Sequence, residues 1–185
     1  MTTALLLVDI QNDYFPRGAM EVVGAEAAGA QAAKLLALFR EQGRPVIHMQ
    51  HIAKRAGATF FLPDTPGAEI HGAVRPAAGE PVFQKHFPNS FRETALLDHL
   101  RQTKVSSLVI AGMMTHMCID TTTRAAADLG FVCSLAHDAC ATRALAFNGV
   151  QVPAESVQAA YLAGLNGLFA KVRPVNELCT ELRPL

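Results

Sequence analysis

The sequence contains little charge and no excess of either sign. Only 17% of its 185 residues are charged, and 16 basic side chains are balanced by 16 acidic ones. A protein that binds nucleic acid or an anionic membrane usually has a basic patch and a positive net charge. Neither partner is expected here, and a small-molecule substrate is the simpler expectation.

Long apolar runs are also missing. No run approaches the roughly 20 residues needed to span a bilayer, and no basic segment precedes the short apolar run 4–8, so a signal peptide is not expected. The four cysteines, Cys118, Cys133, Cys140 and Cys179, form no C-x-x-C pair. These absences predict a reduced, cytoplasmic protein.

Hydrophobic residues, in contrast, make up half of the chain. A length of 185 residues suffices for one well-packed domain but is short for two, so a single domain over 1–185 is expected. Because a small monomer has difficulty burying so much apolar surface, we expect a homo-oligomer, a dimer or higher.

Strand-like and helix-like patterns alternate along the chain, which predicts a three-layer α/β/α domain of the Rossmann-like type. A helix over 90–101 is predicted from Ser90 and Glu93, which have the spacing of a capping box. Pro174 restricts the last strand to a sheet edge. The expected strands are 4–10, 45–50, 81–85, 108–111, 131–136 and 172–175. The other expected helices begin near 25 and near 118, and a long one covers 154–170.

Residues 51–79 form a long segment rich in glycine and proline that also contains Phe60 and Phe61. A loop of this length is unusual in a compact domain unless it serves as a lid or a pocket wall. A surface excursion held by the two phenylalanines is an equally good interpretation. A second, shorter loop is expected at 137–142.

Three chemically capable residues follow or end three predicted strands: Asp9, Lys85 and Cys118. Ligands of parallel sheets bind outside the carboxyl ends of the strands. Cys118 falls in the first turn of a helix, where the helix dipole favours the thiolate. Asp9 has the chemistry to accept the thiol proton, and Lys85 to hold the carboxylate ionised. Backbone N–H groups of Met114 and Cys118 offer an oxyanion hole.

Each of these residues also has an ordinary structural interpretation. An aspartate at a strand end often caps a loop, a lysine there is usually solvated, and a cysteine on an alanine-rich helix is most often inert packing. The residues alone leave both interpretations open.

Four segments together resemble the isochorismatase-like cysteine hydrolase superfamily, which includes nicotinamidases and N-carbamoylsarcosine amidohydrolase. They are Leu-Leu-Val-Asp-Ile-Gln-Asn-Asp-Tyr-Phe (6–15), Lys-His-Phe-Pro-Asn-Ser-Phe (85–91), Gly-Met-Met-Thr-His-Met-Cys (112–118) and His-Asp-Ala-Cys-Ala-Thr (137–142). Any one segment is weak evidence, but the combination and its spacing cover nearly the whole chain.

The resemblance implies a parallel six-stranded sheet and a catalytic triad of Asp9, Lys85 and Cys118. It also implies a cis peptide bond between Met113 and Met114 that directs the Met114 N–H into the oxyanion hole. Superfamily members that hydrolyse the vinyl ether of isochorismate typically lack the cysteine. Cys118 therefore argues for hydrolysis through a covalent acyl-enzyme.

Nicotinamidases carry an Asp-x-His metal motif after the second strand, where this chain has His51 and Ala53. We therefore expect no metal and no cofactor, although His48, His51 and His71 are candidate zinc ligands. Thr115 is more simply a helix cap than a substrate contact. The candidate substrate-binding residues are Gln11, Tyr14, His51, Phe60, Phe61, Thr115 and His116.

The expected function is hydrolysis of a small amide or carbamoyl C–N bond through a thioester on Cys118. One alternative is a thiol-based sensor or small-molecule binding protein without turnover, in which Cys118 is oxidised or liganded. Another is a purely structural oligomer with an inactive pocket. The sequence does not name the substrate.

Overall fold

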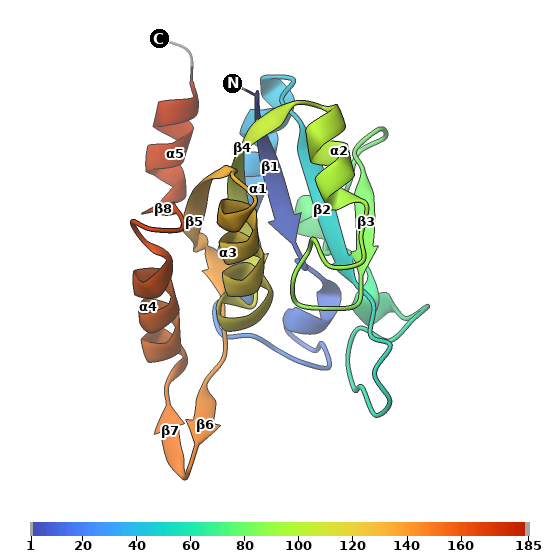
Figure 1. Cartoon of the computed structure of the whole chain (residues 1–185). Helices are drawn as coiled ribbons and strands as arrows, with labels where there is room; N and C mark the ends of the chain where they lie inside the picture. Colours follow the sequence, from blue (N-terminus) through green and yellow to red (C-terminus); the bar gives the residue numbers. More distant parts are fainter. Residues whose placement is uncertain (1, 184–185) are drawn as a thin grey trace.

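The structure, a computed structural model, describes residues 2–183 and is built around a six-stranded sheet (Figure 1). All neighbouring strands in this sheet are parallel. The order is β3 (Val82–Lys85), β2 (Val46–His51), β1 (Thr2–Val8), β4 (Val105–Met113), β5 (Val132–Ala141) and β8 (Lys171–Arg173). The predicted parallel α/β sheet is confirmed.

Helices cover both faces of the sheet (Figure 1). Leu5 and Leu7 of β1 belong to one core, whereas Leu6 and Val8 belong to the other. A strand buried on both faces has no polar side, which explains the continuous apolar run. The first core contains α1 (Ala25–Glu41) and α5 (Val175–Leu182), and the second contains α2 (Leu96–Gln102), α3 (Asp120–Asp128) and α4 (Ala154–Leu165). In 2–183, no helix is long and apolar enough to cross a membrane.

The strand order reverses at β1, since β2 and β3 extend the sheet on one side and β4 pairs on the other. Gly112 of β4 lies opposite Val8, and a Cβ atom there would overlap the Val8 carbonyl oxygen. Its φ of +140° is also one that glycine tolerates best. Glycine thus lets β4 approach the end of β1, so the residues after both strands share one crevice.

The segment after β2 is tied to the segment after β1 rather than being a free excursion. The Asn12 N–H donates to the Glu69 carbonyl at 3.0 Å, and the His71 N–H donates to the Ile10 carbonyl at 2.8 Å. The segment contains two short 3-10 turns, η2 (Pro66–Ala68) and η3 (Gly72–Val74), and η1 (Asn12–Tyr14) follows β1. Part of this segment lines a pocket, as the lid or pocket-wall interpretation predicts.

The predicted helix over 90–101 is wrong in its first half, because α2 begins only at Leu96. Ser90 does not cap it: its buried hydroxyl hydrogen-bonds the Thr122 hydroxyl of α3 at 2.9 Å. Glu93 is exposed and has a φ of +55°, which is incompatible with a helical turn. The Ser90 side chain, expected to begin the helix, instead links the turn before α2 to α3.

The fifth strand is longer than predicted. β5 continues to Ala141 and covers most of the expected loop at 137–142, because its register against β4 shifts between Ile110 and Gly112. Beyond it, strands β6 (Leu145–Phe147) and β7 (Val150–Val152) form a hairpin that was not predicted. Its turn, Asn148-Gly149, has positive φ at both residues, the usual signature of a type I′ turn.

The carboxyl-terminal part also differs from the prediction. α4 ends at Leu165 rather than near residue 170, and β8 ends at Arg173. The edge position of β8 is confirmed. Pro174, placed in the last strand by the prediction, is the N-cap of α5, a helix that the prediction missed.

Candidate active site

Asp9, Lys85 and Cys118 meet at the carboxyl end of the sheet. Asp9 follows β1, Lys85 ends β3, and Cys118 lies in η4 (Thr115–Ile119), a π-helical turn between β4 and α3. The Lys85 Nζ lies 2.7 Å from Asp9 Oδ2 and 3.3 Å from Cys118 Sγ. Asp9 and Lys85 are fully buried, and Cys118 is 5% exposed. Three segments distant in sequence thus place a carboxylate, an ammonium and a thiol in contact.

The Lys85 ammonium is surrounded by acceptors. Besides the carboxylate and the thiol, it lies 3.2 Å from His51 Nδ1, 3.0 Å from the Phe87 carbonyl oxygen and 3.4 Å from the Pro88 carbonyl oxygen. The contacts hold the cation in one place although it is shielded from water. A buried charge is tolerated only with such compensation.

Asp9, His51 and Cys118 present three potential metal-ligand atoms within 4.8 Å of one another. The Lys85 ammonium contacts all three residues. Its positive charge therefore occupies the position from which a metal ion would contact the same three groups. The other two candidate zinc ligands, His48 and His71, have different partners. His48 Nε2 lies 2.9 Å from Glu80 Oε2, and the His71 ring stacks on Phe15.

Burial raises the pKa of the Cys118 thiol, the nearby Asp9 carboxylate raises it further, and Lys85 only partly opposes them. This direction is opposite to the one expected from a helix N-terminus, because loss of water outweighs the helix dipole. The resting cysteine is therefore a neutral thiol. The Asp9 carboxylate lies close enough to the thiol to be the acceptor of its proton.

Burial lowers the pKa of the Lys85 ammonium, but Asp9 and Cys118 together raise it more, so the net shift is upward and Lys85 stays charged. Burial also lowers the pKa of His51, against the opposing effect of Asp9. His51 is therefore neutral near pH 7. Because lysine only donates hydrogen bonds, His51 Nδ1 must be the acceptor and Nε2 carries the ring hydrogen.

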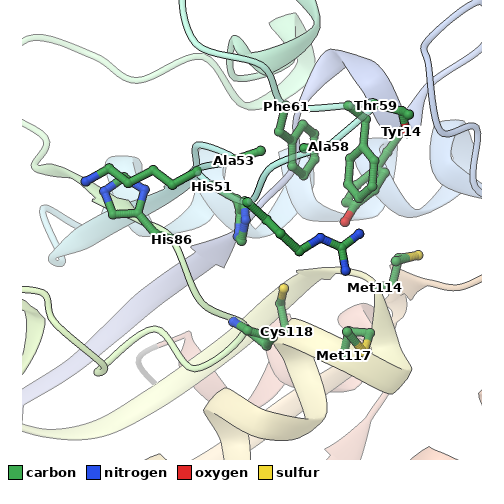
Figure 2. A pocket seen from close by; sticks show the side chains of 14 residues that line it. Tyr14, His51, Ala53, Ala58, Thr59, Phe61, His86, Met114, Met117 and Cys118 are labelled. Atoms are coloured by element: carbon green, nitrogen blue, oxygen red, sulfur yellow. The ribbon is translucent and has the colours of Figure 1, made fainter.

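A pocket of about 270 Å³ opens next to the thiol (Figure 2). Tyr14, Phe60 and Phe61 form an aromatic wall, with the Tyr14 and Phe61 rings 4.6 Å apart. Burial raises the pKa of the Tyr14 phenol well above its usual value, so the phenol is neutral. The volume lies just below the range of pockets that hold drug-sized ligands, about 300–1,000 Å³. The site therefore suits a small substrate.

Four of the seven candidate substrate-binding residues line this pocket: Tyr14, His51, Phe60 and Phe61. Gln11, Thr115 and His116 are not among its lining residues. The buried Thr115 hydroxyl donates to the Ala141 carbonyl at 3.2 Å and does not cap the helix. His116 Nδ1 lies 2.6 Å from the Thr142 hydroxyl.

Gln11 contacts His51 instead of the pocket. Its side-chain Nε2 donates to the His51 carbonyl at 2.9 Å and to the Ala68 carbonyl at 2.7 Å, while its Oε1 accepts from the His51 N–H at 2.8 Å. The Gln11 side chain thus joins the backbone of His51 to that of Ala68.

The turn after β4 brings Met114 and Cys118 to the same pocket. The Met113–Met114 peptide bond is cis. The Met114 carbonyl oxygen accepts the N–H groups of Met117 and Ile119, at 3.0 and 3.3 Å. This carbonyl is therefore engaged within the turn.

A model of the isochorismatase domain matches residues 3–176. The chain belongs to the isochorismatase family of hydrolases.

Among its relatives, the isochorismatase family protein YddQ of Bacillus subtilis (strain 168) is 52% identical over 94% of this chain and 96% of its own length. A crystal structure of an isochorismatase hydrolase from Oleispira antarctica is also 52% identical, with a TM-score of 0.94 over 97% of this chain and 96% of its own. Maleamate amidohydrolase of Pseudomonas putida (KT2440) is 34% identical over 69% of this chain and 67% of its own length.

Eight further residues line the pocket of this isochorismatase-family hydrolase and were not predicted: Ala53, Lys54, Arg55, Ala58, Thr59, His86, Pro88 and Met117. His86 Nδ1 is 2.8 Å from the Ile52 carbonyl oxygen, so the ring is fixed against the chain that follows β2. The adjacent basic pair Lys54-Arg55, inside the segment expected to form a pocket wall, was the available signal for positive charge on that wall.

Proposed function

We propose that this protein is a cysteine-dependent hydrolase that cleaves the C–N bond of a small amide or carbamoyl compound through a thioester acyl-enzyme. The observation that carries the proposal is the position of Lys85 Nζ, in contact with both the Asp9 carboxylate and the Cys118 thiol beside the pocket. One similar protein, maleamate amidohydrolase, is named for cleaving an amide.

In the acylation step, the Cys118 sulfur attacks the substrate carbonyl carbon as the thiol proton passes to Asp9. The tetrahedral intermediate places its negative oxygen near the backbone N–H groups of Met114 and Cys118. The C–N bond then breaks, Asp9 returns the proton to the leaving nitrogen, and ammonia or an amine departs. The acyl group remains on sulfur as a thioester.

In the deacylation step, water attacks the thioester carbonyl and gives a proton to Asp9. The C–S bond breaks, Asp9 reprotonates the sulfur, and the acid leaves. Lys85 remains protonated throughout, since its pKa is raised by Asp9 and Cys118 despite the opposing effect of burial. Its charge orients Asp9 and compensates the sulfur as negative charge develops there.

A redox sensor is less well supported by the same site. Sensor cysteines are usually accessible and have a lowered pKa, because the thiolate is the oxidised species. Here burial and Asp9 raise the pKa of Cys118. The site suits a thiol that loses its proton only when a carbonyl compound is attacked.

Mass spectrometry of the protein mixed with a panel of amides, carbamates and lactams tests the proposal. We expect an acyl adduct on Cys118 and release of ammonia or amine, and both should disappear in Cys118→Ala. Cys179→Ala, at a half-buried cysteine of α5, is the matched control and should retain turnover. Full activity in Cys118→Ala, or an adduct confined to another cysteine, would contradict the mechanism.

A further inference from the structure

Two cations lie at the pocket without partners. Lys54 and Arg55 line the same pocket as Cys118, and both are exposed. Within residues 2–183, neither side chain forms an ion pair or a hydrogen bond. Aspartate and glutamate are absent from the described lining of the pocket. The only charges on its wall that are fixed at neutral pH are therefore positive.

The Asp9 carboxylate, which lies beside Cys118, does not balance these cations. Asp9 lies 2.7 Å from Lys85 Nζ, so each neutralises the other. Asp9 therefore does not offset the positive charge of Lys54 and Arg55. A concave apolar wall next to such charge concentrates its field on whatever enters.

Both cations belong to a loop, residues 53–61, whose base is held in place. We call it the pocket loop. The Ala53 N–H donates to the Phe61 carbonyl at 2.9 Å, and the Phe61 N–H donates to Asp13 Oδ2 at 2.6 Å. A turn closed by the Ala58 N–H on the Arg55 carbonyl, at 3.1 Å, forms its tip. The loop thus presents the two cations from an anchored frame, whose Ala53, Ala58 and Phe61 are seen in Figure 2.

We propose that Lys54 and Arg55 form a carboxylate-binding subsite, and that the substrate is a small amide or carbamoyl compound bearing a carboxylate. The inference rests on the proposed function and adds the substrate's charge to it. The carbonyl group reaches Cys118 while the carboxylate stays near the loop cations. A pocket of about 270 Å³ keeps the two groups only a few bonds apart.

Two chemical sources of the carboxylate are distinguishable. It can belong to the acyl part, as in the monoamide of a dicarboxylic acid, or to the amine part, as in an N-carbamoyl amino acid. Succinamate and N-carbamoylglycine are suitable probes. Their neutral isosteres, succinamide and N-carbamoylglycinamide, differ only by a carboxamide in place of the carboxylate.

Steady-state kinetics on the full-length protein tests the subsite. We expect at least one charged probe to be turned over with a higher kcat/KM than its neutral isostere. In the double variant Lys54→Gln/Arg55→Gln, the KM for that probe should rise about tenfold, as expected for two exposed charge contacts, with little change in kcat. The KM for the isostere should stay the same. Added salt should raise the wild-type KM for the charged probe only.

Two controls separate charge from structure. Lys54→Arg/Arg55→Lys keeps both charges and should retain most of the affinity. Arg101→Gln removes an exposed cation from α2 and should change nothing.

The inference is overturned if the charged probes have no advantage over their isosteres, or if the double variant affects both equally. If the neutral isosteres acylate Cys118 as well as the charged probes do, the proposed hydrolase stands and only the subsite is wrong. If neither charged probe is turned over, the subsite is wrong, and the wider amide panel decides the hydrolase separately.

Discussion

The side-chain amide of Gln11 pairs with both backbone polar groups of His51, as a neighbouring strand would, at 2.8 and 2.9 Å. Gln11 follows β1 and His51 ends β2, so the pairing extends the contact between the two strands beyond their ladder. It holds the backbone of His51, whose ring Nδ1 accepts a hydrogen bond from Lys85. We therefore expect Gln11 to be a positioning residue for Lys85, the lysine of the proposed triad.

Replacing Gln11 by methionine should impair both stability and activity. The change leaves the backbone groups of His51 without partners in a buried place, which costs about 2–4 kcal/mol of unfolding free energy. Displacement of His51 and Lys85 should lower kcat/KM by about 10- to 100-fold. Chemical denaturation and steady-state kinetics measure the two effects.

Gln50→Met is the matched control. Gln50 Nε2 also donates to the Ala68 carbonyl, at 2.9 Å, but its side chain has no hydrogen bond to His51. Gln50→Met should lower the free energy of unfolding by about 1 kcal/mol and leave kcat/KM close to the wild-type value. Equal kinetic losses in both variants would show that Gln11 has no particular role at the site.

The neutral state of His51 predicts an acidic limb in the pH profile. Burial lowers the pKa of His51 below its ordinary 6.5, so folding favours the neutral ring. The stability that this contributes is fully present above about pH 6.5 and is lost as the pH falls toward the folded-state pKa. Protonated His51 also repels Lys85, so kcat/KM should decline over the same acidic range.

The profile should be flat from about pH 7 to 9. Lys85 remains charged there, because Asp9 and Cys118 raise its pKa more than burial lowers it, and the raised pKa of Cys118 keeps the resting thiol neutral. His51→Gln should remove or displace the acidic limb, whereas His116→Gln should preserve it. A rise in kcat/KM through pH 8–9 would instead indicate a thiol that ionises before attack.

The sequence was most informative where the chain is buried and regular. The apolar run that became β1 and the placement of Asp9, Lys85 and Cys118 after strands suffice to predict a parallel sheet with three reactive groups at one edge, because parallel strands align their carboxyl ends. Which residues touch was not predictable. The five acceptors around Lys85, two of them backbone carbonyls, depend on how 85–88 turns after β3.

Polar residues were harder to interpret because each has several possible partners. Ser90 and Thr115 both resemble helix caps in sequence, yet one hydroxyl bonds Thr122 and the other the Ala141 carbonyl. These partners lie 32 and 26 residues away, so local pattern carries no trace of them. Gln11 was expected in the pocket, but it contacts the backbone of His51 and Ala68, which lie 40 and 57 residues away. The Asn148-Gly149 turn was a local signal that the prediction overlooked.

Removal of Lys85 should destabilise the fold through Asp9. Lys85→Met leaves the fully buried carboxylate without its compensating charge, at a cost of about 3–5 kcal/mol. In Asp9→Asn/Lys85→Met no charge remains, so most of that stability should return while kcat/KM stays at least about 10³-fold below wild type. Thermal denaturation of the two single variants and the double variant gives the coupling. Additive losses would show that the two groups do not compensate each other.

Substitution of Gly67 tests whether the anchoring of the pocket loop affects substrate binding. A Cβ atom at Gly67 would overlap the Asp13 carboxylate, which accepts the N–H groups of Phe61 and Ala19 at 2.6 and 3.1 Å. Gly67→Ala should displace that carboxylate and loosen the loop at Phe61. Overpacking of this kind lowers the free energy of unfolding by about 1–3 kcal/mol. We also expect KM to rise by a larger factor than kcat falls.

Gly72→Ala is the control, because a Cβ atom there meets nothing within 4 Å. It lies in η3 of the same long segment and should leave both stability and KM nearly unchanged. If Gly67→Ala lowers stability without raising KM, Asp13 anchors the fold but not the pocket. A rise in KM confined to Gly67→Ala would instead link substrate affinity to a carboxylate that is not itself among the residues lining the pocket.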